Sequence, residues 1–245
     1  MSNGDTSTPP LKEMKNNMKT LVGIRPTGYL HLGHYFSVIK PALKYNADVL
    51  IADLHAPDSE IELEDFEHEL RSYGLGNIIS QALDDVLYFR LLQLASFGDL
   101  ERMTQFKSGK KNPHLFCYPV LMACDLVGYD RVVVGEDQRQ HIEFARELAR
   151  KYEKKYGELK MPTPIYSEVK VMSLTEPEKK MSKSEPKGCL FLGDPETKEK
   201  LKKAVTNEAG RKNLENLYRE FVGEPPEMNS KLKENLAEAL IKKFG

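Results

Sequence analysis

The sequence predicts an α/β protein, in which a Rossmann-like parallel sheet with helices on both faces is joined to a small C-terminal helical domain. Three short runs rich in apolar residues, at Met18 to Val22, Val49 to Ala52 and Arg131 to Val134, have the composition of buried parallel strands. Segments with helical patterns separate these runs, and helical patterns alone fill the stretch from Thr197 to Phe244.

The composition is that of a globular protein. Of the 245 residues 40% are hydrophobic, enough for a core, and no apolar run approaches the ~20 residues of a membrane span. The polar stretch 1–17 has no secretory signal. We therefore expect a cytoplasmic protein with a disordered leader over 1–17, a Rossmann domain over 18–190 with a helical insertion at roughly 75–130, and a C-terminal helical region over 191–245.

Charge and cysteine content indicate which ligands and bonds the chain is suited to form. The net charge of −1 gives no global basic field, although Lys179 to Lys187 forms a local basic patch that could bind phosphate groups. Cys117, Cys124 and Cys189 lack CxxC spacing, so reduced thiols are favoured over zinc ligands or disulfides.

The first strand leads into a candidate phosphate-binding turn. Residues 26–28 (PTG) end the apolar run, HLGH follows at 31–34, and Tyr35 to Leu43 has helical periodicity. Backbone N–H groups and the positive end of a helix bind anions in such strand–turn–helix units. A glycine allows close approach of the ligand, and two histidines add hydrogen-bond donors.

The second strand ends in polar residues, Asp53 and His55, which would face a ligand crevice at the carboxyl edge of a parallel sheet. An ordinary strand exit with Asp53 as a helix cap explains the pattern equally well. Beyond it we expect a surface helix over Glu60 to Ser72, and one strand and one helix within Asn77 to Phe97.

A further helix is expected over Leu100 to Lys107, with Asp99 as its N-cap. The apolar stretch Tyr118 to Tyr129 then holds one carboxylate, Asp125. Its neighbours are largely apolar, which favours a pocket-facing acid over one on the solvent-facing stripe of a helix.

The third strand precedes a second polar turn. Gly135, Glu136, Asp137 and Gln138 follow Arg131 to Val134, and a helix is expected over Gln140 to Tyr156. A glycine followed by acids at the end of a strand often holds ribose hydroxyls. The alternative is an N-cap that needs only Asp137.

A last strand is expected over Val169 to Leu174, followed by a lysine-rich loop, Glu176 to Lys187, that contains KMSKS at 180–184. By composition this is a mobile surface loop, and its ammonium and hydroxyl groups would suit a polyphosphate. The remaining chain predicts helices over 197–206, 213–221 and 231–244.

Together these motifs resemble class I aminoacyl-tRNA synthetases, whose two signatures are HIGH and KMSKS. The segments LERMTQFK (100–107), MACD (122–125), GEDQRQH (135–141) and VMSL (171–174) resemble the tryptophanyl branch. The resemblance implies an α/β enzyme, a homodimer with 99–107 near its interface, that activates L-tryptophan with ATP and Mg²⁺ carried by the ATP. It then transfers the amino acid to tRNA(Trp).

The resemblance also implies residue roles. Catalysis would involve His31, His34, Lys180 and Lys183. ATP would be bound by Arg25, Pro26, Thr27, Gly33, His34, Gly135, Glu136, Asp137, Val171, Lys180, Met181, Ser182, Lys183 and Ser184. Asp125 would accept the indole N–H of tryptophan in a pocket completed by Tyr118, Met122, His55 and Gln138. No resident metal site is implied.

Some features depart from the commoner family pattern. Arg25 stands where many bacterial members have Gln, the HLGH motif is complete where theirs is degenerate, and only 185–245 follow KMSKS, which implies a reduced anticodon-reading region. HLGHY and ADLHA also resemble archaeal-type tyrosyl enzymes. Tyrosine as substrate, an enzyme that does not charge tRNA, and a non-catalytic nucleotide- or RNA-binding regulator therefore remain alternatives.

Overall fold

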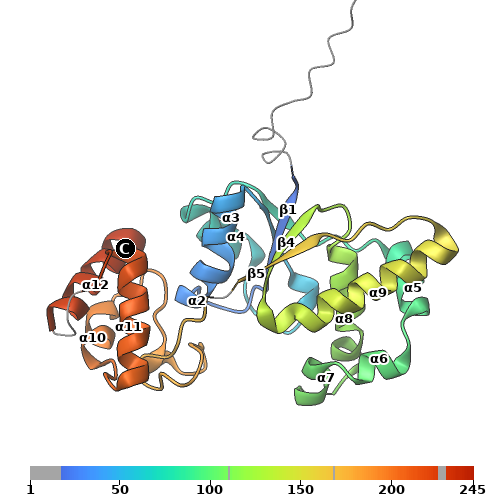
Figure 1. Ribbon diagram of the computed structural model, residues 1–245. Coiled ribbons are helices and arrows are strands. Elements are labelled where there is room, and N and C mark those ends of the chain that lie inside the picture. The colour runs from blue at the N-terminus through green and yellow to red at the C-terminus, as the bar shows by residue number, and fades with distance from the viewer. Residues whose placement is uncertain (1–17, 110, 168, 226–229) are drawn as a thin grey trace, which may run out of the picture. The chain divides into compact units, whose positions relative to one another are not determined.

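The computed structural model describes residues 18–109, 111–167, 169–225 and 230–245 (Figure 1). The leader expected over 1–17 lies outside the described residues. The chain forms two compact units, which are described separately. The sheet unit comprises residues up to 25, 41–57 and 76–167, and the helical unit comprises 26–40, 58–75 and 168–245. These units differ from the domains expected from the sequence, whose boundary near residue 190 stays a prediction.

The sheet unit is built on a five-stranded parallel sheet in the order β3-β2-β1-β4-β5 (Figure 1). In chain order the strands are β1 (Thr20–Ile24), β2 (Asp48–Ile51), β3 (Ile78–Ser80), β4 (Arg131–Gly135) and β5 (Thr163–Ser167). The chain moves outward from β1 to β3 and then returns to β4 on the other side of β1. This reversal is the switch point at which ligands bind outside the carboxyl ends of the strands. The predicted Rossmann-like sheet is confirmed.

Register explains the shift of the first strand from its expected position. Ile24 pairs with Ile51 of β2, and Thr20 pairs with Arg131 of β4. The Lys19 N–H, by contrast, donates to the Asp130 side chain at 3.0 Å. The strand therefore runs from residue 20 to 24 instead of 18 to 22.

The expected strand at 169–174 is wrong, and a strand at Thr163–Ser167 was missed. All five residues of β5 pair with β4. Pro164 cannot donate to a ladder, and it is tolerated because β5 lies at the edge of the sheet. Within 169–174 the pairing is limited to one bridge, between Met172 and Lys180, because this segment leads into the KMSKS loop.

Helices of the sheet unit complete its core. They are α3 (Lys40–Tyr45), which begins at the unit boundary, and α5 (Asp85–Leu94), α6 (Phe97–Glu101), α7 (Thr104–Ser108), α8 (Pro113–Asp125) and α9 (Arg139–Tyr156). Leu91, Val120 and Leu148 are fully buried in one cluster with Leu21 and Val132 of the sheet. The predicted helix over 140–156 is confirmed, as is one strand with one helix inside 77–97.

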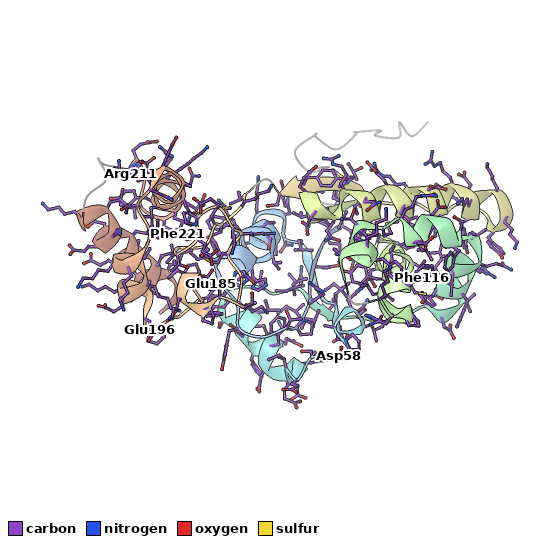
Figure 2. The ribbon with its side chains drawn as sticks, turned by 90° about the horizontal axis from the view of Figure 1, so that it is seen from below. Asp58, Phe116, Glu185, Glu196, Arg211 and Phe221 are labelled. Atoms are coloured by element: carbon purple, nitrogen blue, oxygen red, sulfur yellow. The ribbon has the colours of Figure 1, made fainter. Side chains whose placement is uncertain are left out.

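The single helix expected over 100–107 is wrong, because the segment forms two short helices. Ser96, not Asp99, caps α6, since its hydroxyl accepts the Asp99 N–H at 3.1 Å. Phe116 of α8, labelled in Figure 2, joins both helices: its ring lies 4.8 Å from that of Phe97 and 5.0 Å from that of Phe106. Tertiary packing on this ring favours the break in the helix.

The helical unit contains α2 (Leu32–His34), the π-helical segment η1 (Tyr35–Ile39), α4 (Leu63–Ser72), α10 (Thr197–Lys203), α11 (Glu208–Phe221) and α12 (Ser230–Phe244). The helix expected from Tyr35 thus begins three residues earlier. Its Tyr35 ring lies 5.5 Å from Phe221, labelled in Figure 2, and 5.1 Å from Phe244. These aromatic contacts fix the segment after HLGH against α11 and α12.

Two further findings concern the whole described chain. Among its helices, none combines the length and apolar character needed to cross a membrane. All three cysteines are free, and burial raises the pKa of the Cys124 thiol to about 12 and that of Cys189 to about 11. The thiols of Cys124 and Cys189 therefore stay protonated near neutral pH.

Candidate active site

In the helical unit the side chains of the two HLGH histidines each accept a backbone N–H at the start of α2. His31 is the N-cap of α2, and its Nδ1 accepts the Gly33 N–H at 3.0 Å. The Nδ1 of His34 accepts the His31 N–H at 3.2 Å, which completes a reciprocal capping box. Because both Nδ1 atoms accept hydrogen bonds, a neutral ring carries its hydrogen on Nε2. The local fold thus sets the tautomer of both histidines.

Burial keeps His31 neutral. Its pKa is lowered to about 4, first by burial and then by the charges of Lys183 and Lys180. A neutral ring can keep its Nδ1 as an acceptor, whereas a charged ring would lose the cap. Gly33 is required by the same contact, since a Cβ there would lie 2.6 Å from Cε1 and 2.8 Å from Nδ1 of His31.

The KMSKS loop reaches the turn that precedes HLGH. The Lys183 ammonium donates to the backbone carbonyl of Thr27 at 2.6 Å and to its hydroxyl at 2.9 Å. Gly28, beside them, has φ +111°, a conformation that favours glycine. Thr27 and Lys183 are 156 residues apart in the sequence. The two motifs therefore meet within one unit although they are distant along the chain.

Hydrogen bonds hold the KMSKS loop at its base, and the expected mobility of the loop stays a prediction. Met181 is buried, and its N–H donates to the Val171 carbonyl at 2.9 Å. Glu185, labelled in Figure 2, accepts from the Ser173 hydroxyl at 3.0 Å and also from Thr175. Lys180, Ser182 and Ser184 were also predicted in this site, and the two serine hydroxyls lie 2.9 Å apart.

In the sheet unit, Asp125 lies at the end of α8 with only 9% of its side chain exposed. The Nε2 atom of His55, which follows β2, is 2.8 Å from Asp125 Oδ2. The Tyr118 ring, about two helical turns before Asp125 on α8, packs on the His55 ring at 4.3 Å. Burial raises the pKa of the Tyr118 hydroxyl, although the charge of Arg25 opposes this. The solvent-facing alternative for Asp125 is therefore wrong, and its role as a pocket-facing acid stays a prediction.

Sequence reasoning missed Gln81. Its side-chain Nε2 donates to both oxygens of Asp125, at 2.8 and 3.0 Å. The residue directly follows β3 (Ile78–Ser80), so it too lies at the carboxyl edge of the sheet. The position of Gln81 directly after a strand could have marked it as a site residue. The sequence pattern, however, did not show where this short strand ends within 77–97.

His141, the last residue of GEDQRQH, was also missed as a site residue. It is 2% exposed, its ring lies 5.6 Å from Tyr118, and neither ring nitrogen has a hydrogen-bond partner. Its pKa is lowered to about 4, chiefly by burial and further by His55, while Asp137 opposes the shift. Buried polar groups are normally paired, so such atoms mark a place for a ligand or water.

Other buried polar atoms without a hydrogen-bond partner lie in the turns that follow β2 and β4. Asp53 Oδ1, His55 Nδ1 and Gln138 Oε1 are buried without a partner. Asp53 is the first residue of a short 3₁₀ helix, Asp53–His55, whose N-cap position is Ala52 and which has no side-chain cap bond. The cap interpretation of Asp53 is therefore wrong, and its carboxylate belongs to the polar edge beyond β2.

The turn after β4 is shaped by three predicted residues. Asp137 folds back against Gly135, where a Cβ would collide with its carboxylate, and accepts a bond from Gln138 at 3.1 Å. Asp137 does not cap α9, whose N-cap position is Gln138 without a side-chain cap bond, so that alternative is wrong. Glu136 instead accepts two bonds from Arg139, at 2.6 and 2.9 Å.

Three other predicted site residues differ in their burial. Pro26 is buried, and its carbonyl accepts a bond from the Ser59 hydroxyl. Arg25 is exposed at the end of β1, and Met122 is partly buried against the core cluster of the sheet unit. In the described part of the chain no three His, Cys, Asp or Glu residues form a group that could hold a metal ion.

A family model described as "tRNA synthetases class I (W and Y)" matches residues 12–89 and 79–244. The chain belongs to this family. A tryptophan–tRNA ligase of Clostridium tetani is 34% identical over 288 residues, which cover 93% of this chain and 83% of the relative. The tryptophanyl-tRNA synthetase structure from Mycoplasma pneumoniae has a TM-score of 0.78 and 27% identity, covering 93% of this chain and 85% of that one.

A second synthetase structure is informative because of its ligands. The tryptophanyl-tRNA synthetase from Campylobacter jejuni, complexed with ADP and tryptophan, has a TM-score of 0.71 and 26% identity, and covers 93% of this chain and 88% of that one. The class I resemblance predicted from HLGH and KMSKS is thus confirmed, whereas the roles of single residues stay predictions.

The buried His141 of this synthetase predicts acid sensitivity. Between pH 6.5 and about 4 an unfolded His141 binds a proton that the folded one does not, so the free energy of unfolding falls as pH is lowered through this window. We expect His141→Phe to flatten that decline in urea unfolding measured at several pH values, with His31 responsible for part of the remainder. Parallel curves for variant and wild type would contradict this assignment.

Proposed function

We propose that the chain is a tryptophan–tRNA ligase, which activates L-tryptophan with ATP to tryptophanyl-adenylate and transfers the amino acid to tRNA(Trp). The observation that carries the substrate assignment is the buried Asp125 carboxylate, held by His55 and Gln81 among apolar residues. The indole N–H can only donate a hydrogen bond, and an acceptor is what this pocket offers. The related enzymes' names agree with this assignment.

The amino-acid site comprises Asp125, Tyr118, Met122, His55 and Gln138. Asp125 accepts the indole N–H, and Tyr118 and Met122 supply ring and thioether surface for the indole. The unpaired Gln138 Oε1 is an acceptor suited to the substrate ammonium group. A site built around a substrate donor rejects analogues without it far more strongly than a size difference could.

The nucleotide groups comprise Lys180, Lys183, His31 and His34, together with the turn at Thr27 and Gly33. Two ammonium groups and two Nε2–H donors match the charge of a polyphosphate. Lys183 now donates to Thr27, and it would exchange these bonds for phosphate oxygens. Within the helical unit, Pro26, Met181, Ser182, Ser184 and the Val171 backbone complete this set. For the sheet unit, the family resemblance assigns Arg25, Gly135, Glu136 and Asp137 to nucleotide binding, chiefly of the ribose.

The reaction has two steps. The tryptophan carboxylate attacks the α-phosphorus of ATP, the bond to the bridging oxygen breaks, and pyrophosphate leaves with the electron pair. The 2′-hydroxyl of the terminal tRNA adenosine then attacks the adenylate carbonyl and AMP leaves. No protein nucleophile takes part, so the side chains act by positioning and by stabilising charge. Mg²⁺ enters with the ATP, as is usual for this cation.

We also propose a cytoplasmic homodimer. The support is an exposed apolar surface on α5 and α6, where Val86 is 56%, Phe89 65% and Phe97 70% exposed. Large exposed apolar side chains near one another are typical of interfaces. This surface includes the segment around Asp99 that the sequence resemblance placed near a dimer contact.

A second candidate substrate is tyrosine, because a phenol hydroxyl can also donate to Asp125. Pyrophosphate exchange run separately with tryptophan and tyrosine decides between them, and we expect exchange with tryptophan. Exchange without charging of tRNA(Trp) would instead support an enzyme with another acceptor. No exchange with any amino acid would favour a non-catalytic regulator.

Asp125→Ala should raise the KM for tryptophan by about 10²-fold or more, because it removes a hydrogen bond to a charged group and leaves His55 without its partner. The KM for ATP should change little. Asp65→Ala, an exposed position on α4, is the matched control. Wild-type tryptophan kinetics in the Asp125 variant would rule out this carboxylate as the indole acceptor.

Lys183→Ala should lower the rate of adenylate formation by about 10²-fold while weakening ATP binding much less, because the ammonium stabilises charge that develops in the transition state. Single-turnover kinetics and equilibrium binding separate the two effects. Lys187→Ala, exposed in the same segment, is the control. Equal losses in rate and in binding would contradict a transition-state role.

A further inference from the structure

Gln81 is held so that its amide can face Asp125 in one orientation only. The backbone N–H of Leu54 donates to its Oε1 at 2.9 Å. A backbone N–H cannot accept, so the amide atom beside Leu54 must be the oxygen. The amide nitrogen therefore faces Asp125 and donates to it.

The donors around Asp125 are distributed unequally between its two oxygens. Oδ2 lies 3.0 Å from Gln81 Nε2 and 2.8 Å from His55 Nε2, whereas Oδ1 lies 2.8 Å from Gln81 Nε2. A carboxylate oxygen has two acceptor sites. In these contacts, both acceptor sites of Oδ2 are occupied, by Gln81 and His55, whereas Oδ1 accepts from Gln81 alone and keeps its second site.

We propose that Gln81 is a positioning residue for amino-acid selection: it anchors the Asp125 carboxylate in an orientation that directs one Oδ1 acceptor site to the indole N–H. The inference rests on the proposed function, since it deepens the role of the Asp125 pocket. Gln81 acts through Asp125 and need not touch the substrate itself.

The physical reason is the cost of a buried charge. A carboxylate that is 9% exposed is stable only when donors surround it. Without the Gln81 amide, Oδ1 loses its donor and the carboxylate is free to rotate out of its present orientation. The acceptor is then missing where the indole N–H must bind.

A merely structural role for Gln81, tying the end of β3 to α8, makes a different prediction. Loosening the pocket in that way would weaken every amino acid of similar shape alike. A role in presenting an acceptor affects only substrates that donate to it. A tryptophan analogue in which sulfur replaces the indole N–H, β-(benzothiophen-3-yl)alanine, separates the two.

The experiment is pyrophosphate exchange by the whole chain carrying Gln81→Met, with tryptophan and with the analogue. We expect kcat/KM for tryptophan to fall by about 10- to 100-fold, the range for a hydrogen bond to a charged group, and that for the analogue to change less than about twofold. Gln93→Met, an exposed position on α5, is the matched control. An equal fall with both substrates, or no fall with either, would overturn the proposal.

Gln81→Glu supplies an isosteric second variant with a pH readout. Two adjacent carboxyl groups share one proton more readily as pH falls, and the shared proton restores a donor to Asp125. Relative to wild type at the same pH, tryptophan activity of this variant should therefore rise between about pH 8 and about pH 6. A ratio that is constant with pH would overturn the proposal even if Gln81→Met failed to fold.

The experiments distinguish failure of the proposed function from failure of the role proposed for Gln81. Absence of tryptophan-dependent exchange in the wild-type chain would refute the proposed function. Normal wild-type exchange with no substrate-selective loss in the Gln81 variants would refute this inference alone.

Discussion

A carboxylate that is nearly excluded from water must be surrounded by donors, and this requirement organises the sheet unit. Asp125 is satisfied by His55 after β2 and by Gln81 after β3, so the ends of two strands and of α8 are brought to one place. Among the described residues, further buried polar atoms without a partner occur in Asp53 and His55 after β2, and in His141, whose ring lies 5.6 Å from that of Tyr118.

The helical unit meets a comparable requirement at HLGH. The first N–H groups of a helix need acceptors, and here the two histidine Nδ1 atoms supply them. The same bonds place a hydrogen on each Nε2, which is the form that donates to phosphate. One set of contacts therefore serves both the local fold and the proposed chemistry, and Gly33 is small because the His31 ring needs the space.

Much of the fold could be predicted from the sequence. The apolar runs around β1, β2 and β4 are buried on both faces, and this gives them a composition that few other structures share. The edge strand β5 was missed, and a strand was expected six residues later, because Thr163–Ser167 and the segment after it are equally compatible with an extended backbone. Only pairing with β4 distinguishes them. Likewise, the break between α6 and α7 depends on the Phe116 ring of another helix.

The sequence by itself determined the family, through HLGH and KMSKS, and indicated a buried acid at Asp125, because motifs and apolar neighbours are local properties of the chain. Only the tertiary structure decided which groups satisfy that acid. Gln81 is separated from Asp125 by 44 positions, and no local pattern marks it as a partner. The histidine tautomers and the Lys183–Thr27 contact were decided in the same way, since hydrogen-bond partners distant along the chain are set by folding and not by sequence spacing.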